Sequence, residues 1–141
     1  MKKTNFLLLT ANILTGLAFL VHAFVGDSEI NQIQPALNTI DWAKKQEIWT
    51  MARCGWHWIS FDLLMATVAL TLLNFTNYFE NRKIILQLLS LFFFGYAIVW
   101  ILLILLSDSF SNNFLKLGQW ILLLSISALI YYGAKNQKLE A

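Results

Sequence analysis

Four long apolar stretches, separated by polar segments, dominate the hydrophobic pattern of the chain. They cover roughly residues 6–25, 54–75, 84–106 and 114–133, and each is about 20 residues long. A helix of that length spans about 30 Å of hydrocarbon, whereas a buried helix of a soluble protein rarely runs so far without charge. The pattern therefore predicts an all-α integral membrane protein, an up-down four-helix bundle that forms a single four-span domain over residues 1–141.

The composition agrees with this prediction and excludes other classes of protein. Hydrophobic residues make up 58% of the chain and charged residues only 13%, too few to cover the surface of a globular domain. The net charge of +2 and the lack of a basic stripe give no indication of a nucleic-acid partner. Cys54 is the only cysteine, which excludes an internal disulfide and dithiol exchange of the CxxC kind.

The first apolar stretch is open to two interpretations. Met1-Lys2-Lys3 followed by an apolar run has the form of a secretory signal, and Val21-His22-Ala23 is a tolerable cleavage site. The run is longer than a usual signal core, however, and it contains Asn12, Thr15 and Gly16, which suit a packed helix. For these reasons we expect the stretch to be retained as a span. Cleavage would remove His22 from the protein.

Positive charges and tryptophans suggest an orientation. With the N-terminus inside, six Lys and Arg residues fall in cytoplasmic segments and four in outer segments. We therefore expect an N-in, C-in, multi-pass protein of a cell membrane, as in a bacterial inner membrane. This topology places every tryptophan in the outer half of the protein, either as an interfacial belt or as the wall of a cavity that opens outward: Trp42, Trp49, Trp56, Trp58, Trp100 and Trp120.

The segment between the first two spans is too long to be a structureless connection. Pro35 can start a helix, and apolar residues recur after it at roughly helical spacing. We predict an amphipathic helix over about residues 36–50 that lies in the outer interface and can continue into the second span. It would act either as a lid over a site or as a spacer anchored by Trp42 and Trp49.

The sharpest chemical signal is a pair of histidines placed at matching depth near the outer ends of adjacent spans. His22 continues a face of small residues on the first span, and His57 lies one turn into the second. Two such imidazoles can ligate one transition metal or one haem, and Asp27 and Glu29 at the membrane exit could complete a metal site. The alternative is that each histidine is a hydrogen-bonded residue of the interface.

Asp62 is the acidic residue that lies deepest in the apolar part of the chain. A carboxylate there must stay neutral or find a partner on another helix or in a ligand, and Gln119 is one candidate. Around this acid and the two histidines, Arg53, Trp56 and Trp58 are the side chains expected to line an outward-facing pocket between the first two spans.

These features favour binding of a metal, a haem or another small ligand in that pocket over catalysis, in a protein whose first partner is the lipid bilayer. Two alternatives stay open. The polar groups could dock a membrane protein partner or a second copy, which would make the chain an accessory subunit. They could also serve an enzyme acting on a lipid or quinone, with His22 or His57 as base and Asp62 as acid. No nucleophile–base motif, HExxH spacing or phosphate-binding loop decides the question.

Overall fold

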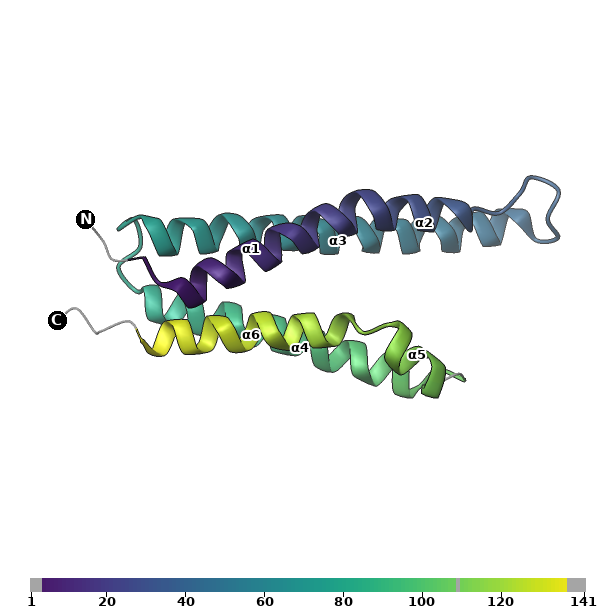
Figure 1. Cartoon of the computed structure of the whole chain (residues 1–141). Helices are drawn as coiled ribbons and strands as arrows, with labels where there is room; N and C mark the ends of the chain where they lie inside the picture. The colour runs from purple at the N-terminus through teal and green to yellow at the C-terminus, as the bar shows by residue number, and fades with distance from the viewer. Residues whose placement is uncertain (1–3, 109, 137–141) are drawn as a thin grey trace. The chain divides into compact units, whose positions relative to one another are not determined.

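All regular structure in the described part of the chain is helical, which confirms the predicted all-α class. The computed structural model describes residues 4–108 and 110–136. The elements in chain order are α1 (Phe6–Leu20), the π-helical segment η1 (Val21–Gly26), α2 (Asp27–Gln32), α3 (Trp42–Phe75), α4 (Arg82–Leu105), α5 (Phe110–Lys116) and α6 (Gln119–Lys135) (Figure 1).

Three helices are long and apolar enough to cross a membrane. The first runs without interruption through α1, η1 and α2 for 27 residues, α3 has 34 residues and α4 has 24. Their surfaces carry many exposed large apolar side chains, among them Phe6, Leu17, Phe24, Leu91, Val99 and Leu103. A water-exposed surface of this kind would be unstable, whereas lipid tails accept it. The helix α6 has 17 residues.

The interfacial helix predicted for residues 36–50 has different bounds in the structure. Residues 33–41 form turns rather than helix, and helix begins only at Trp42. Asp41 adopts a left-handed backbone with φ 58°, which reverses the chain, and its carbonyl accepts the first helical bond from the Lys45 amide at 3.1 Å. From there α3 continues to Phe75 without a break, so the loop helix and the second apolar stretch are one element.

The fourth apolar stretch, predicted over residues 114–133, is interrupted at Leu117–Gly118. The indole N–H of Trp100 donates to the Leu117 carbonyl at 3.0 Å. The Ile121 amide, which would bond that carbonyl in a continuous helix, bonds the Gly118 carbonyl instead, also at 3.0 Å. A shorter i→i+3 turn therefore starts α6 afresh at Gln119.

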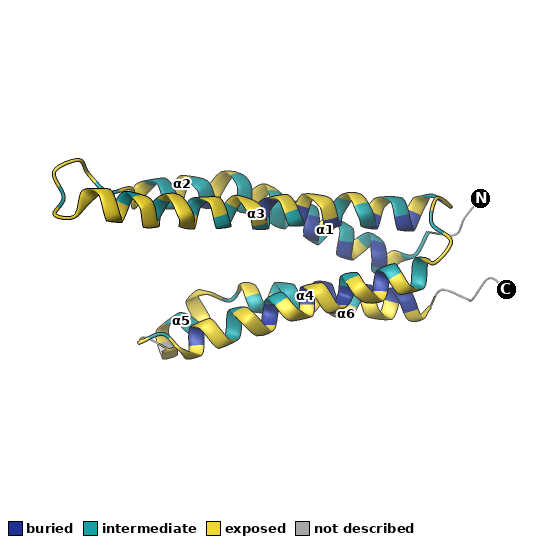
Figure 2. Cartoon of the chain, turned by 180° about the vertical axis from the view of Figure 1, so that it is seen from behind, coloured by how far each residue is buried: buried dark blue, intermediate teal, exposed yellow. Residues whose placement is uncertain are grey.

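The helices fall into two units. Within its described residues, the first unit contains the start of α1 (4–12) and the chain after residue 69. Its centre is the antiparallel pair of α4 and α6, joined by Ser90 and Ser127, whose hydroxyls each donate to the other's backbone carbonyl at 2.9 and 2.8 Å. Buried segments of the ribbon recur along both helices (dark blue in Figure 2). The buried apolar residues of the pair include Leu86, Phe93, Ala97, Ile126 and Ile130.

In this first unit, hydrogen bonds of Asn5 and Asn74 connect the start of α1 with the ends of α3 and α6. The Asn5 backbone N–H donates to Asn74 Oδ1 at 3.0 Å, and the Asn5 side-chain amide donates to the Gly133 carbonyl at 2.9 Å. Asn5 Oδ1 also accepts from the Leu7 amide at 3.1 Å, which caps α1. Asn74 is 1% exposed, so its polar groups need these partners.

The second unit spans residues 13–68 and is a helical hairpin. The end of α1 together with η1 and α2 lies beside the first two thirds of α3, and residues 33–41 connect the two arms (Figure 1). Few of its residues are buried, and they are small or medium in size: Thr15, Gly26, Ser60, Leu63 and Ala66. The hairpin is therefore held largely by polar and aromatic contacts.

Replacing Gly133 by valine should destabilise the first unit. A Cβ atom at Gly133 would lie 2.5 Å from Leu8 Cδ2 and 2.9 Å from its Cγ, and Leu8 is fully buried. Overpacking of this kind costs about 1–3 kcal/mol, so the thermal midpoint of the detergent-solubilised protein should fall by several degrees. Gly95→Val is the matched control, because nothing lies within 4 Å of a Cβ there. An equal fall in both variants would contradict the packing described.

Candidate functional site

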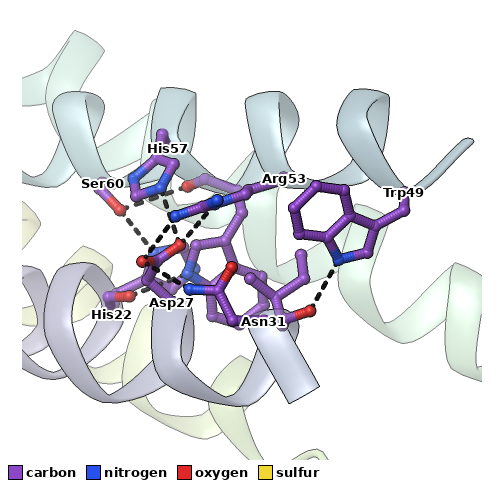
Figure 3. Close-up of polar contacts among 9 residues, drawn as sticks. His22, Asp27, Asn31, Trp49, Arg53, His57 and Ser60 are labelled. Carbon is purple, nitrogen blue, oxygen red and sulfur yellow. Dashed lines mark hydrogen bonds and ion pairs between the residues drawn. The ribbon is translucent and has the colours of Figure 1, made fainter. Parts of the chain in front are cut away.

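A cluster of charged and aromatic side chains joins α2 to α3 in the second unit (Figure 3). At its centre, the Asp27 carboxylate accepts two hydrogen bonds from Arg53, Nε to Oδ1 at 2.9 Å and Nη2 to Oδ2 at 3.0 Å. His57 Nε2 lies 3.0 Å from Asp27 Oδ1, and the Asn31 amide donates to Oδ2 at 3.2 Å. One carboxylate thus collects four polar contacts from three side chains.

The π-helical segment η1 places the first histidine against α3. Its wider turns carry His22, whose imidazole stacks on the Trp56 indole with centroids 3.9 Å apart and planes 7° from parallel. The Trp56 indole N–H donates to the His22 carbonyl at 2.8 Å. Gly26, at the end of the segment, is buried and lies directly against the ring of Trp56. Glycine is needed there because a side chain would overlap the indole.

The hydrogen bonds of Ser60 define the orientation of the His22 ring. His22 Nδ1 lies 2.9 Å from the Ser60 hydroxyl oxygen, and that hydroxyl donates to the Trp56 carbonyl at 3.3 Å. Since a hydroxyl has one proton, this arrangement assigns the N–H to His22 Nδ1 and the lone pair to Nε2. Nε2 is the ring nitrogen left to accept a proton or a ligand group.

A second aromatic residue closes the cluster on the side of the loop. The Trp49 indole N–H donates to the Ile30 carbonyl at 2.8 Å, and the Arg53 guanidinium lies 5.4 Å from the centre of the Trp49 ring. A cation over an aromatic face is attracted to it. Trp49 therefore fixes the end of α2 and also holds the guanidinium in the plane that meets Asp27 (Figure 3).

The cluster is open on one side. The side chain of Arg53 is 36% exposed and that of His57 is 45% exposed, whereas Asp27 is 22% exposed. Ion pairs with this much exposure contribute little to stability. Their bidentate geometry instead gives the site directional preference, since guanidinium and carboxylate match in shape and charge.

The structure brings together five of the residues singled out in the sequence: His22, Asp27, Arg53, Trp56 and His57. Others lie elsewhere. Trp58 is 74% exposed and Glu29 is exposed on α2. Asp62 is partly exposed rather than buried, five residues beyond His57 on α3. Gln119 belongs to the first unit and Asp62 to the second, so their pairing stays a prediction.

The predicted metal set of His22, His57, Asp27 and Glu29 finds no support in the geometry. Among the described residues, no three His, Cys, Asp or Glu side chains are placed to hold one metal ion. Three residues of the cluster were not anticipated from the sequence: Asn31, Ser60 and Gly26. Helical spacing offered a signal for two of them, because Asn31 lies four residues after Asp27 and Ser60 four after Trp56.

Comparisons with known proteins name no relative of this chain, so its function is inferred from the site described above. Searches of protein-family models, of curated proteins and of solved structures found no match for the chain.

Substituting Gly26 tests the contact on which the histidine stack depends. Gly26→Ala should force the Trp56 ring away from η1, which costs about 1–3 kcal/mol and should lower the thermal midpoint. Gly55→Ala is the control, since nothing lies within 4 Å of a Cβ there. Combining Gly26→Ala with Trp56→Leu should recover part of the loss, because the smaller side chain vacates the space. Additive effects in the double variant would contradict the contact.

Proposed function

We propose that this chain is a four-span integral membrane protein that binds a small anionic ligand, a carboxylate or a phosphate, through Arg53 and His57. The observation that carries the proposal is the set of contacts to Asp27: a guanidinium and an imidazole already arranged around a carboxylate, with both side chains more than a third exposed. An arrangement that accommodates an internal carboxylate suits an external one.

Donors remain for a second anion at this site. Arg53 has five N–H bonds, and Asp27 takes one from Nε and one from Nη2 among the described residues. His57 meets Asp27 through Nε2, which leaves Nδ1 for another partner. Asp27 would then orient the Arg53 and His57 side chains, and the ligand would occupy their exposed side. A ligand that displaced Asp27 would use the same donors.

The position along α3 supports a site at the membrane surface. The apolar stretch from Cys54 to Phe75 is long enough to span about 30 Å of hydrocarbon, so Arg53 and His57 lie at its start. Trp49 and Trp56 flank them, as expected near an interface. In the proposed topology α6 supplies the fourth span, since its 17 residues reach the lower limit for crossing a bilayer.

The geometry favours a small anion over a metal ion. No three His, Cys, Asp or Glu side chains in the described part of the chain are placed to hold one metal ion. A metal ion would compete with the Arg53 guanidinium for the Asp27 oxygens. An anion would bind to N–H donors of Arg53 and His57 that are already gathered at one place.

One observation favours the alternative of an accessory subunit. The connection between the arms of the hairpin carries large apolar side chains that are strongly exposed: Ile33 is 71%, Leu37 79% and Ile40 82% exposed. A partner protein could cover them. A stable complex that dissociates in a Leu37→Asp variant, together with a lack of anion binding, would favour this alternative over the ligand-binding function.

The orientation can be tested with single cysteines in a Cys54→Ser background. Lys45→Cys lies near the start of α3 and Lys83→Cys near the start of α4, on opposite sides of the membrane in the proposed topology. A membrane-impermeant maleimide should label Lys45→Cys in intact cells and Lys83→Cys only after permeabilisation. Labelling of both in intact cells would contradict the four-span topology, and the reverse pattern would contradict the N-in orientation.

Anion binding can be measured by calorimetry with inorganic phosphate and acetate on the detergent-solubilised protein, at ionic strength held constant with chloride. We expect saturable binding that weakens at least ten-fold in Arg53→Gln, because the charge-assisted bonds are lost. Lys45→Gln removes a nearby charge outside the cluster and should leave binding unchanged. Equal binding by both variants, or heats indistinguishable from those of chloride, would contradict the proposal. Helical content by circular dichroism establishes that each variant is folded.

A further inference from the structure

The antiparallel pair α4 and α6 leaves an open groove along one side, within the first unit. The groove has a volume of about 630 Å³, in the range of sites that hold small molecules. Polar residues lie at one end, where Gln87 faces Tyr131 and Tyr132. Apolar residues lie toward the other end: Leu91, Phe94 and Leu124. The groove is thus polar at one end and apolar at the other.

The crossing of the two helices explains why the groove exists. Ser90 and Ser127 exchange hydrogen bonds with each other's carbonyls, and their hydroxyl oxygens lie 3.1 Å apart. Small residues allow helices to approach closely at such a crossing. The groove beside this crossing is lined by the two serines and Ala128 together with larger side chains, among them Phe94 and Tyr131.

Two lysines extend the polar end of the groove. Lys83 precedes Ser90 by seven residues and Lys135 follows Ser127 by eight, so both lie about 10–12 Å from the crossing in the same direction. Lys83 precedes Gln87 by four residues and Lys135 follows Tyr131 by four, about one helical turn each, which keeps both lysines on the faces that line the groove. The antiparallel arrangement therefore brings two positive charges to one end.

These lysines have no ion-pair partner in the described part of the chain. The nearby Arg82 is already bonded to the Asn77 side chain and the Phe79 carbonyl. Glu80, the acidic residue closest to Lys83 in sequence, is exposed and is not paired with it. Long lysine side chains at the end of a span can reach the level of the lipid headgroups while their stems stay in apolar surroundings.

We infer that the α4–α6 groove binds an anionic phospholipid. One acyl chain lies along Leu91, Phe94 and Leu124, and the polar linkage of the lipid meets Gln87 and the tyrosines. The phosphate lies between Lys83 and Lys135, because basic sites between membrane helices attract anionic headgroups. This site shares no residue with the cluster around Asp27 and does not depend on the function proposed for that cluster.

Native mass spectrometry of the full chain, titrated with phosphatidylglycerol or phosphatidylcholine, tests the inference. The wild type should bind phosphatidylglycerol more tightly. Replacing both lysines (Lys83→Gln with Lys135→Gln) should weaken that binding about thirty-fold, since each interfacial lysine contributes roughly five-fold. Lys44→Gln with Lys45→Gln is the matched control and should keep the preference. Ala128→Trp fills the groove and should weaken binding of both lipids.

Several results would overturn the inference. Equal affinity for the two lipids would show that the lysines do not select a charge. Binding unaffected by Ala128→Trp would place the lipid elsewhere. Equally tight binding of glycerol 3-phosphate would show that the site takes a free phosphate rather than a lipid, and a dimer that excludes lipid would show that a second copy occupies the groove. The lysine and tryptophan substitutions lie at partly or fully exposed positions, so folding should persist.

Discussion

Apolar surroundings leave polar groups without water, so each polar side chain along these helices depends on a partner supplied by another part of the chain. Three groups of polar contacts in the fold illustrate this dependence. Ser90 and Ser127 bond each other's backbones, Asn74 bonds the start of α1, and Asp27 collects its partners from α2 and α3. Two buried oxygens, on Asn12 and Gln46, lack a partner within the described residues. Hydrogen bonds between polar side chains therefore determine which helices pack against each other, a choice that uniformly apolar surfaces would not make.

Local backbone geometry and side-chain chemistry are connected in the second unit. The π-helical segment carries His22 and ends at Gly26, where the lack of a side chain admits the indole of Trp56. The indole then stacks on the imidazole and donates to the backbone carbonyl of His22, while the Ser60 hydroxyl contacts Nδ1 of that ring. Such segments occur often at functional sites because they shift side chains out of regular helical register. Here the shift gives one imidazole a fixed orientation.

Arg53 has different surroundings from Lys83 and Lys135, and this difference is the basis for the different roles proposed for them. Arg53 meets a carboxylate, a tryptophan face and solvent, which suits directional recognition of a planar or tetrahedral anion. Lys83 and Lys135 lie one helical turn beyond Gln87 and Tyr131 of the α4–α6 groove, without an ion-pair partner among the described residues, which suits a mobile headgroup above an acyl chain. The planar guanidinium of Arg53 is thus proposed to orient a bound anion, whereas the long, flexible lysine side chains are proposed to reach a lipid headgroup.

Apolar length alone determined the helical class and the approximate positions of the three described helices that are apolar enough to span a membrane, because about 20 uncharged residues in a row satisfy their backbone in hydrocarbon only as helix. The positions of His22 and His57 near the ends of neighbouring apolar stretches also predicted that they lie in one region, and both belong to the cluster in the second unit. Tertiary structure decided the rest. A left-handed Asp41 merged the loop helix with α3, and the Trp100 indole interrupted the last stretch at Leu117. Asp27 became the centre of the cluster in place of Asp62 because contacts between helices depend on facing angle and register, which periodicity within one helix does not specify.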